Sequence, residues 1–144
     1  MTDASPDARQ RAFIDAARVG RLATVDARGE PSVVPICYVY DGARFYSPID
    51  EKPKRRDVTL RRVRNVGQTG RATLVIDHYE EDWTRLGWVL IRGRAALLEP
   101  GQPGHVAAVA LLRTRYPQYR AMALESAPLI TLTPERIRSW GDLG

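Results

Sequence analysis

The sequence has few of the residues that usually build metal or disulfide sites. It holds a single cysteine, Cys37, which excludes an internal disulfide and a multi-cysteine zinc site. Its two histidines, His78 and His105, lie far apart and lack metal-ligand spacing. No apolar run approaches the roughly 20 residues of a membrane-spanning helix, and the polar start MTDASPDARQ has no signal-peptide core. We therefore expect a cytoplasmic protein without a metal site and without a membrane partner.

The composition is that of an ordinary soluble globular domain. The chain has 144 residues, of which 44% are hydrophobic and 27% are charged, enough to bury a sizeable core. It shows no internal repeat and no low-complexity tail. We expect one domain that covers residues 1–144.

Positive charge gathers in one segment, between Lys52 and Arg64. This segment has a local charge of +6, whereas the formal net charge of the whole chain is +5. It follows a strand-like stretch and leads into a helix, a place that suits a phosphate or a polyanionic tail. The segment contains no aromatic residue that could stack on a base, so we do not expect nucleic acid as a partner. Its seven cations are Lys52, Lys54, Arg55, Arg56, Arg61, Arg62 and Arg64, against one anion, Asp57.

Apolar periodicity and turn signals predict a mainly β chain with three helices. The first helix is expected to begin with Ser5 as N-cap and Pro6 at its first position, and to end at Gly20. Strands are expected over residues 21–26, 32–40, 43–47, 71–77, 86–98, 128–133 and 136–140, and further helices over 60–66 and 105–115.

The connections favour an antiparallel barrel. The first three strands read as a meander, in which Pro35 marks an edge or a bulge. Gly87 and Gly93 predict a bend or a close approach in the long strand. Short strands joined by tight turns favour six or seven antiparallel strands, whereas a parallel doubly wound sheet would need a glycine fingerprint that is absent.

Several segments resemble the pyridoxamine 5'-phosphate oxidase-like split β-barrel superfamily. GRLATVD at 20–26 and GEPSVVPI at 29–36 are similar to its opening hairpin. DEKPK at 50–54, RNV at 64–66, DHYEEDW at 77–83 and IRSW at 137–140 look like an actinobacterial subgroup described as F420-dependent oxidoreductases. Two places depart from the pattern: 69–71 replaces a frequent Asn-Pro, and Gly87 replaces the first of two paired tryptophans.

The resemblance implies an FMN-binding-like split barrel that forms a homodimer, with the cofactor in a groove at the interface. It implies that the cofactor ring rests on the second and third strands, that its phosphate meets the basic loop, and that Trp88 reaches in from the partner subunit. The site residues that it implies are Val33, Val34 and Pro35 near the ring, Ser47 and Pro48 at the cofactor side chain, Lys52, Lys54 and Arg55 at the phosphate, Arg62 as the helix cation, and Trp88.

The implied activity is hydride transfer between F420 and a small conjugated organic substrate. The cofactor carries this chemistry, which agrees with the lack of a triad, a carboxylate pair or any other predicted catalytic residue. Seven cations favour F420, with its phosphodiester and oligoglutamate tail, over FMN with one phosphate. The alternatives are an FMN-binding oxidase or reductase, disfavoured because the ending WGDLG lacks that oxidase's substrate-binding arginine and proline, and a non-catalytic cofactor-binding or nucleic-acid-binding protein.

Other polar and aromatic residues have a plainer interpretation beside a functional one. Arg61 and Arg64 either join the site or only solvate a helix face. Tyr46 could donate a proton, although a strand tyrosine usually packs. Cys37 is expected in the core, and Asp77, Glu81 and Asp82 are expected in a solvated loop or paired with Arg85. Trp83 and Trp140 are expected to serve packing or a dimer interface.

Overall fold

A computed structural model describes residues 3–49 and 60–144 of the chain. In this part the chain forms seven strands, three α-helices and three short 3-10 turns. The helices are α1 (Ala8–Ala16), α2 (Arg61–Thr69) and α3 (His105–Arg115), and the 3-10 turns span Trp83–Arg85, Pro117–Ala121 and Leu124–Ser126. The strands are β1 (Gly20–Val25), β2 (Pro31–Ile36), β3 (Val39–Tyr40), β4 (Phe45–Pro48), β5 (Arg71–His78), β6 (Gly87–Leu98) and β7 (Leu129–Gly141).

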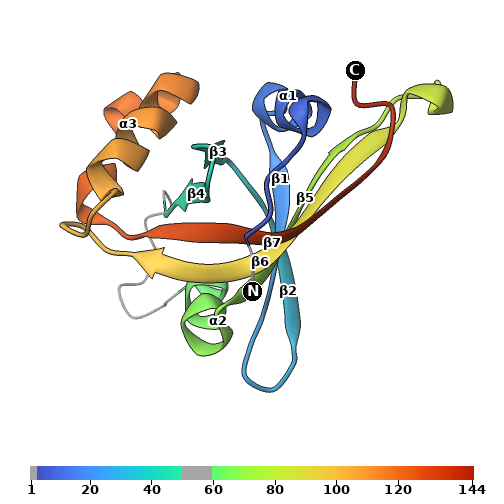
Figure 1. Cartoon of the computed structure of the whole chain (residues 1–144). Helices are drawn as coiled ribbons and strands as arrows, with labels where there is room; N and C mark the ends of the chain where they lie inside the picture. The colour runs from blue at the N-terminus through green and yellow to red at the C-terminus, as the bar shows by residue number, and fades with distance from the viewer. Residues whose placement is uncertain (1–2, 50–59) are drawn as a thin grey trace.

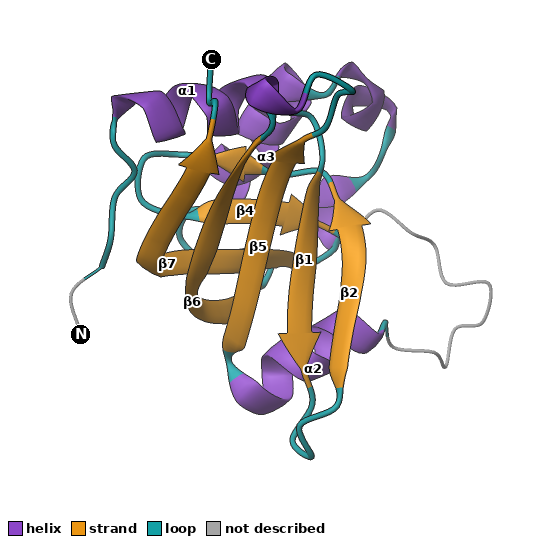
Figure 2. Ribbon diagram, turned by 90° about the vertical axis from the view of Figure 1, so that its right-hand side faces the viewer, coloured by secondary structure: helices purple, strands orange, loops and turns teal. Residues whose placement is uncertain are grey.

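The strands form one antiparallel sheet that curls into a split barrel. Their order is β2-β1-β5-β6-β7-β4-β3. The long strands β6 and β7 pair with each other in the middle of the sheet, between the β1–β2 hairpin and the β3–β4 hairpin (Figure 1). Helix α1 lies at one end of the barrel and α2 at the other (Figure 2). The predicted mainly β, antiparallel split-barrel fold is confirmed.

The predicted three-stranded meander is wrong, because the strand predicted over 32–40 is divided into β2 and β3, and only β3 pairs with β4. Strands β2 and β3 lie at opposite ends of the strand order, and the chain leaves the ladder after Ile36. At Tyr38, hydrogen bonds to side chains take the place of the strand-to-strand hydrogen bonds. The Tyr38 backbone N–H donates to the Tyr116 hydroxyl (3.2 Å), and the Tyr38 hydroxyl donates to the Ile14 carbonyl (2.6 Å). Strand β2 is therefore an edge strand of the described sheet, which agrees with the prediction from Pro35.

Residues 128–133 and 136–140, predicted as two strands, belong to the single strand β7. A register shift between Arg92 and Gly93 of β6 lies opposite Pro134, so the ladder continues through a bulge. A side chain at Gly93 would place its Cβ 2.0 Å from the Thr133 carbonyl oxygen. The close approach expected at Gly93 is thus confirmed.

Helix α1 is capped by Asp7 and not by Ser5. Gln10 N–H donates to the Asp7 carboxylate (2.8 Å), while Asp7 N–H donates to the Gln10 side chain (3.0 Å). This reciprocal capping box needs a polar side chain three residues after the cap. Ser5 has Ala8 at that position, so it cannot form the second bond.

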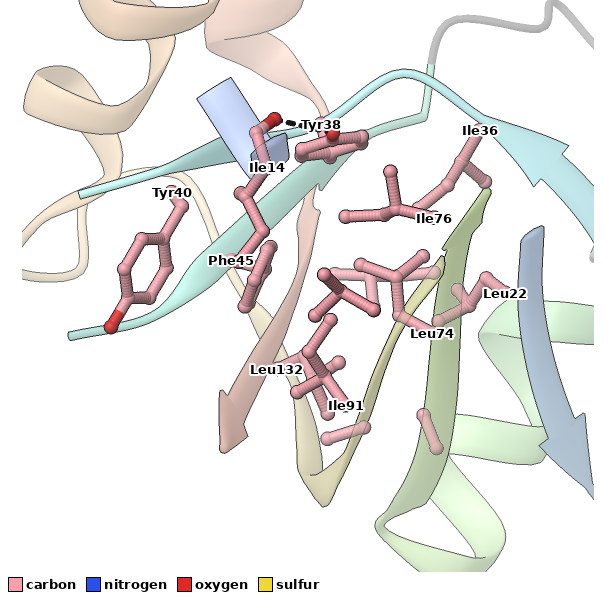
Figure 3. Close-up of a cluster of buried hydrophobic side chains, with 14 of the residues drawn as sticks. Ile14, Leu22, Ile36, Tyr38, Tyr40, Phe45, Leu74, Ile76, Ile91 and Leu132 are labelled. Atoms are coloured by element: carbon pink, nitrogen blue, oxygen red, sulfur yellow. Dashed lines mark hydrogen bonds between the residues drawn. The ribbon is translucent and has the colours of Figure 1, made fainter. Parts of the chain in front are cut away.

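The main core fills the inside of the curl. Alternate residues of β1, β5 and β6 point inward, and Ile14 and Tyr38 close the end near α1 (Figure 3). A second apolar cluster lies under α3 and includes Leu112, Tyr119 and Leu129. The strand residues of the main core are Leu22, Leu74, Ile76, Val89, Ile91, Ala95, Ile130 and Leu132, among others.

Candidate cofactor site

A cavity of about 190 Å³ lies where β2, β4 and α2 come together. Strands β2 and β4 are distant in the strand order, so the curl of the barrel creates this meeting point. Four of the ten predicted site residues line it: Pro35 of β2, Ser47 and Pro48 of β4, and Arg62 of α2. The other lining residues are Val19, Ile36, Cys37 and Tyr119.

Arg62 is the charged residue of this cavity. Only 9% of the residue is exposed, and its Nε finds no hydrogen-bond partner among the described residues. A buried guanidinium group with an unused donor is costly unless an acceptor meets it. The cavity therefore suits a ligand that brings an anionic or strongly accepting group to Arg62.

Helix α2 is held against β1 by polar side chains that sit one turn apart. Asn65 donates to the buried Thr24 hydroxyl (3.0 Å), and the Thr69 hydroxyl donates to the Val25 carbonyl (3.0 Å). Gln68 accepts from the Ala27 backbone N–H (3.0 Å). These bonds fix the helix that presents Arg62 to the cavity.

Three other predicted site residues that the structure describes, Val33, Val34 and Trp88, do not line the cavity. Val33 is 64% exposed on β2, and Val34 packs against the main core. Trp88 is half-buried on β6, where it pairs with Asp77 and Trp140. Its predicted reach into the partner subunit stays a prediction. Lys52, Lys54 and Arg55 lie outside the described residues.

Sequence reasoning did not assign Val19, Cys37 or Tyr119 to the site. Tyr119 is buried and comes from the turn after α3, far along the chain from β2. Cys37, expected in the core, is only half-buried because one side faces the cavity. Cys37 lies two residues after the predicted site residue Pro35. This proximity is the one sequence signal that could have placed Cys37 in the site.

Arg61 and Arg64 line a second, polar hollow of about 290 Å³. Arg28 and Asp26, from the β1–β2 turn, also line this hollow. The pKa of the Asp26 carboxyl lies below its usual value, mainly because the Glu30 backbone N–H donates to it, with Arg28 and Arg61 adding to the effect. Asn65, Ala27 and Gln68 complete the lining.

Tyr46 packs in the interior, as its plainer interpretation predicts, and both histidines have ordinary polar partners. His105 is buried with its Nε2 2.8 Å from the Ala127 carbonyl oxygen, and His78 is exposed beside Glu80. Tyr46 is buried and donates to Asp41 (3.0 Å), and burial raises its pKa.

Within the described ranges no group of three or more side chains could hold a metal ion.

The loop after β5 is solvated, as predicted. Arg85 does form an ion pair there, but its partner is none of the three predicted carboxylates. Arg85 pairs with Glu80 (3.4 Å), and Asp77 pairs with Arg21 across the sheet (3.5 Å). Trp83 and Trp140 are both largely exposed, at 70% and 54%. No helix in residues 3–49 and 60–144 combines the length and the apolar character needed to cross a bilayer.

Solved structures with this fold come from several bacteria. A conserved hypothetical protein, Rv2991 of Mycobacterium tuberculosis, aligns with a TM-score of 0.73 at 19% identity, over 96% of this chain and 86% of that chain. The haem storage protein HutZ of Vibrio cholerae aligns with 0.69 at 16%, over 91% and 90%. An FAD-binding protein of Mesorhizobium loti aligns with 0.64 at 24%, over 96% and 97%. At these identities the likeness concerns the fold.

Two sequence comparisons go further. A 5a,11a-dehydrotetracycline/5a,11a-dehydrooxytetracycline reductase of Streptomyces rimosus is 31% identical over 130 residues, which are 90% of this chain and 78% of the relative. The family model of pyridoxamine 5'-phosphate oxidase matches residues 6–141, almost the whole chain. The chain therefore belongs to the pyridoxamine 5'-phosphate oxidase family.

Proposed function

We propose that this protein binds coenzyme F420 in the cavity at Arg62 and transfers a hydride between that cofactor and a small conjugated organic substrate. Its family and its reductase relative support an oxidoreductase with a flavin-type cofactor. The observation that carries the finer proposal is the buried guanidinium of Arg62, whose Nε is unsatisfied where β2 and β4 meet.

The chain's own part in this function is to bind, orient and exclude water. The deazaflavin, when bound, supplies the hydride chemistry. Pro35 and Ile36 give the cavity a stiff, largely apolar wall, and Ser47 adds a hydroxyl to the lining. Arg62 would hold an anionic or accepting group of the cofactor, because a charge-assisted hydrogen bond is stronger than a neutral one.

The distribution of positive charge favours F420 over FMN. FMN ends in one phosphate, whereas F420 carries several negative charges along its tail. The polar hollow adds Arg28, Arg61 and Arg64 to the cation of the cavity, and among the described residues these three arginines form no ion pair within 4 Å. The sequence adds three further cations just before α2, Lys52, Lys54 and Arg55, which lie outside the described residues.

A homodimer is part of the proposal. The outer face of the sheet exposes apolar side chains, including Val33 (64% exposed) and Trp140 (54%). Register places Trp88 beside Trp140 and Ala23 beside Val33 on this face. Burying this surface against a second copy would be favourable, and it would give Val33 and Trp88 the roles implied by the resemblance. A cytoplasmic location stays a prediction.

Cofactor titrations of the purified protein test the proposal. Fluorescence polarisation of F420 is expected to rise on binding, with a lower dissociation constant than FMN or haem gives by absorbance. Arg62→Gln should weaken F420 binding about 10-fold or more, the loss of one charged hydrogen bond. Arg9→Gln, at an exposed arginine of α1, is the matched control and should bind like the wild type.

Three outcomes would reject the proposal. Tight FMN binding without an F420 response would indicate the oxidase-type alternative. Haem binding alone would indicate a haem protein. Binding only to RNA or DNA, lost as salt rises, would indicate a nucleic-acid module.

A further inference from the structure

A third hollow, of about 430 Å³, shares the lining residue Val19 with the cofactor cavity. Val19 lines both spaces and is 40% exposed. The two spaces thus meet at one apolar side chain in the connection between α1 and β1. The third hollow is lined by Phe13, Ala16, Ala17, Arg18, Val19, Arg21, Asp77 and His78.

Small residues create this hollow. Ala16 and Ala17 end α1 between the larger side chains of Phe13 and Val19, so the space beside them stays open. Phe13 and Ala17 also pack against the main core, which fixes the apolar wall. The core therefore holds this wall in place, and the hollow beside it has room for an apolar group.

The charged groups at the rim are already paired. Arg21 meets Asp77 (3.5 Å), and His78 meets Glu80 (2.7 Å). The Arg18 guanidinium donates to the Arg115 carbonyl and lies 4.6 Å from the centre of the Tyr116 ring. Each of these polar groups already has a partner inside the protein, so the hollow suits an uncharged ligand.

Size indicates why a second space is needed beside the cofactor cavity. Pockets for small molecules usually measure about 300–1,000 Å³, and the cavity at Arg62 offers about 190 Å³. A cofactor ring held there leaves little room for a substrate. The third hollow, which also borders Val19, provides more than twice that volume.

We infer that the hollow at Ala16 is the substrate site and takes an extended, planar, largely uncharged conjugated ring system. This inference rests on the proposed function, because it assigns the other reactant of the same site. Phe13 and Val19 would contact the ring faces, and the Arg21 guanidinium, held by Asp77, can interact with an aromatic face. The end of the ligand that passes Val19 would reach the cofactor cavity.

A fluorescent probe tests this site without a known substrate. N-phenyl-1-naphthylamine, an uncharged planar aromatic amine, is titrated into the full chain with and without F420. Ala16→Trp fills the hollow and should weaken probe binding at least 10-fold, while the F420 dissociation constant changes less than twofold. Ala110→Trp, the same change at an exposed position of α3, should leave both unchanged.

The outcomes separate this inference from the proposed cofactor. Unchanged probe affinity in Ala16→Trp, or no probe binding to the wild type, overturns the substrate site. Loss of probe binding in that variant, from a wild type that does not bind F420, keeps the hollow's ligand class and rejects the cofactor. If circular dichroism shows that Ala16→Trp does not fold, the smaller Ala16→Leu replaces it, with an expected loss of about threefold.

Discussion

The side-chain amide of Asn65 donates a 3.0 Å hydrogen bond to the hydroxyl of Thr24, and both residues are buried. This bond joins α2, which carries Arg62, to β1, the strand next to β2. The position of the cavity's cation thus depends on a polar contact inside the protein.

Breaking this bond should affect both stability and cofactor binding. Asn65→Ala leaves the Thr24 hydroxyl without its donor, so the free energy of unfolding in urea should fall by about 1–3 kcal/mol. A weaker affinity for F420 should accompany it, because α2 loses an anchor. Combining Asn65→Ala with Thr24→Val should cost less than the two single changes added together. Strictly additive costs would show that the bond contributes nothing.

Arg62 should make the cofactor-free protein less stable than an apolar residue would. Arg62→Met removes a buried charged group with an unused donor, so the free energy of unfolding without cofactor should rise by about 1 kcal/mol. Cofactor affinity should fall in the same variant. Chemical denaturation and fluorescence titration measure the two effects. A fall in stability would mean that Arg62 serves the fold and not a ligand.

Gly93 should tolerate no side chain. A Cβ there would lie 2.0 Å from a backbone oxygen of β7, so Gly93→Ala should lower the free energy of unfolding by about 1–3 kcal/mol. Gly67→Ala in α2 is the matched control, since a Cβ at Gly67 meets nothing within 4 Å. That change should stabilise the protein by about 0.5–1 kcal/mol. Equal effects of the two changes in urea denaturation would contradict the packing at the bulge.

The carboxylate of Glu135 should make the free energy of unfolding fall as the pH becomes acidic. Arg71 (2.7 Å) and Arg94 (3.1 Å) both pair with its carboxylate, and the Arg71 bond first of all lowers its pKa in the folded state. The unfolded chain therefore binds this proton more readily, so the stabilisation is present above the unfolded pKa of about 4.3. It is lost as pH falls through the lower folded value. Urea unfolding of Glu135→Gln between pH 7 and pH 3 should show a smaller loss than the wild type. Parallel losses would exclude a contribution from Glu135.

Some features of the fold follow from local sequence, and others do not. The β-rich patterns in the sequence predict the ends of β1, β5 and β6 to within a residue or two. Gly93 predicts a close approach of the long strand β6 to its neighbour. The pairing of β3 with β4 away from β2 depends on Tyr38, whose partners Ile14 and Tyr116 lie far away in the chain. Local periodicity carries no information on such distant bonds.

The candidate site shows the same division. The family resemblance indicates Pro35, Ser47, Pro48 and Arg62, because conserved folds place equivalent positions together. The burial of Arg62 and the arrival of Tyr119 from the turn after α3 arise only when the barrel closes. The hollow beside Ala16 results from two small side chains at the end of a helix, a feature that marks no motif in the sequence.

The meeting of β2 and β4 at the cavity makes ligand binding a reporter of complete folding. These strands are separated by four others in the strand order, so a chain with an open barrel has no cavity to offer. A ligand that binds there selects fully closed molecules, and at 100 times its dissociation constant it adds about 2.7 kcal/mol to their stability. Supply of the cofactor would then set how long a newly made chain resists proteolysis.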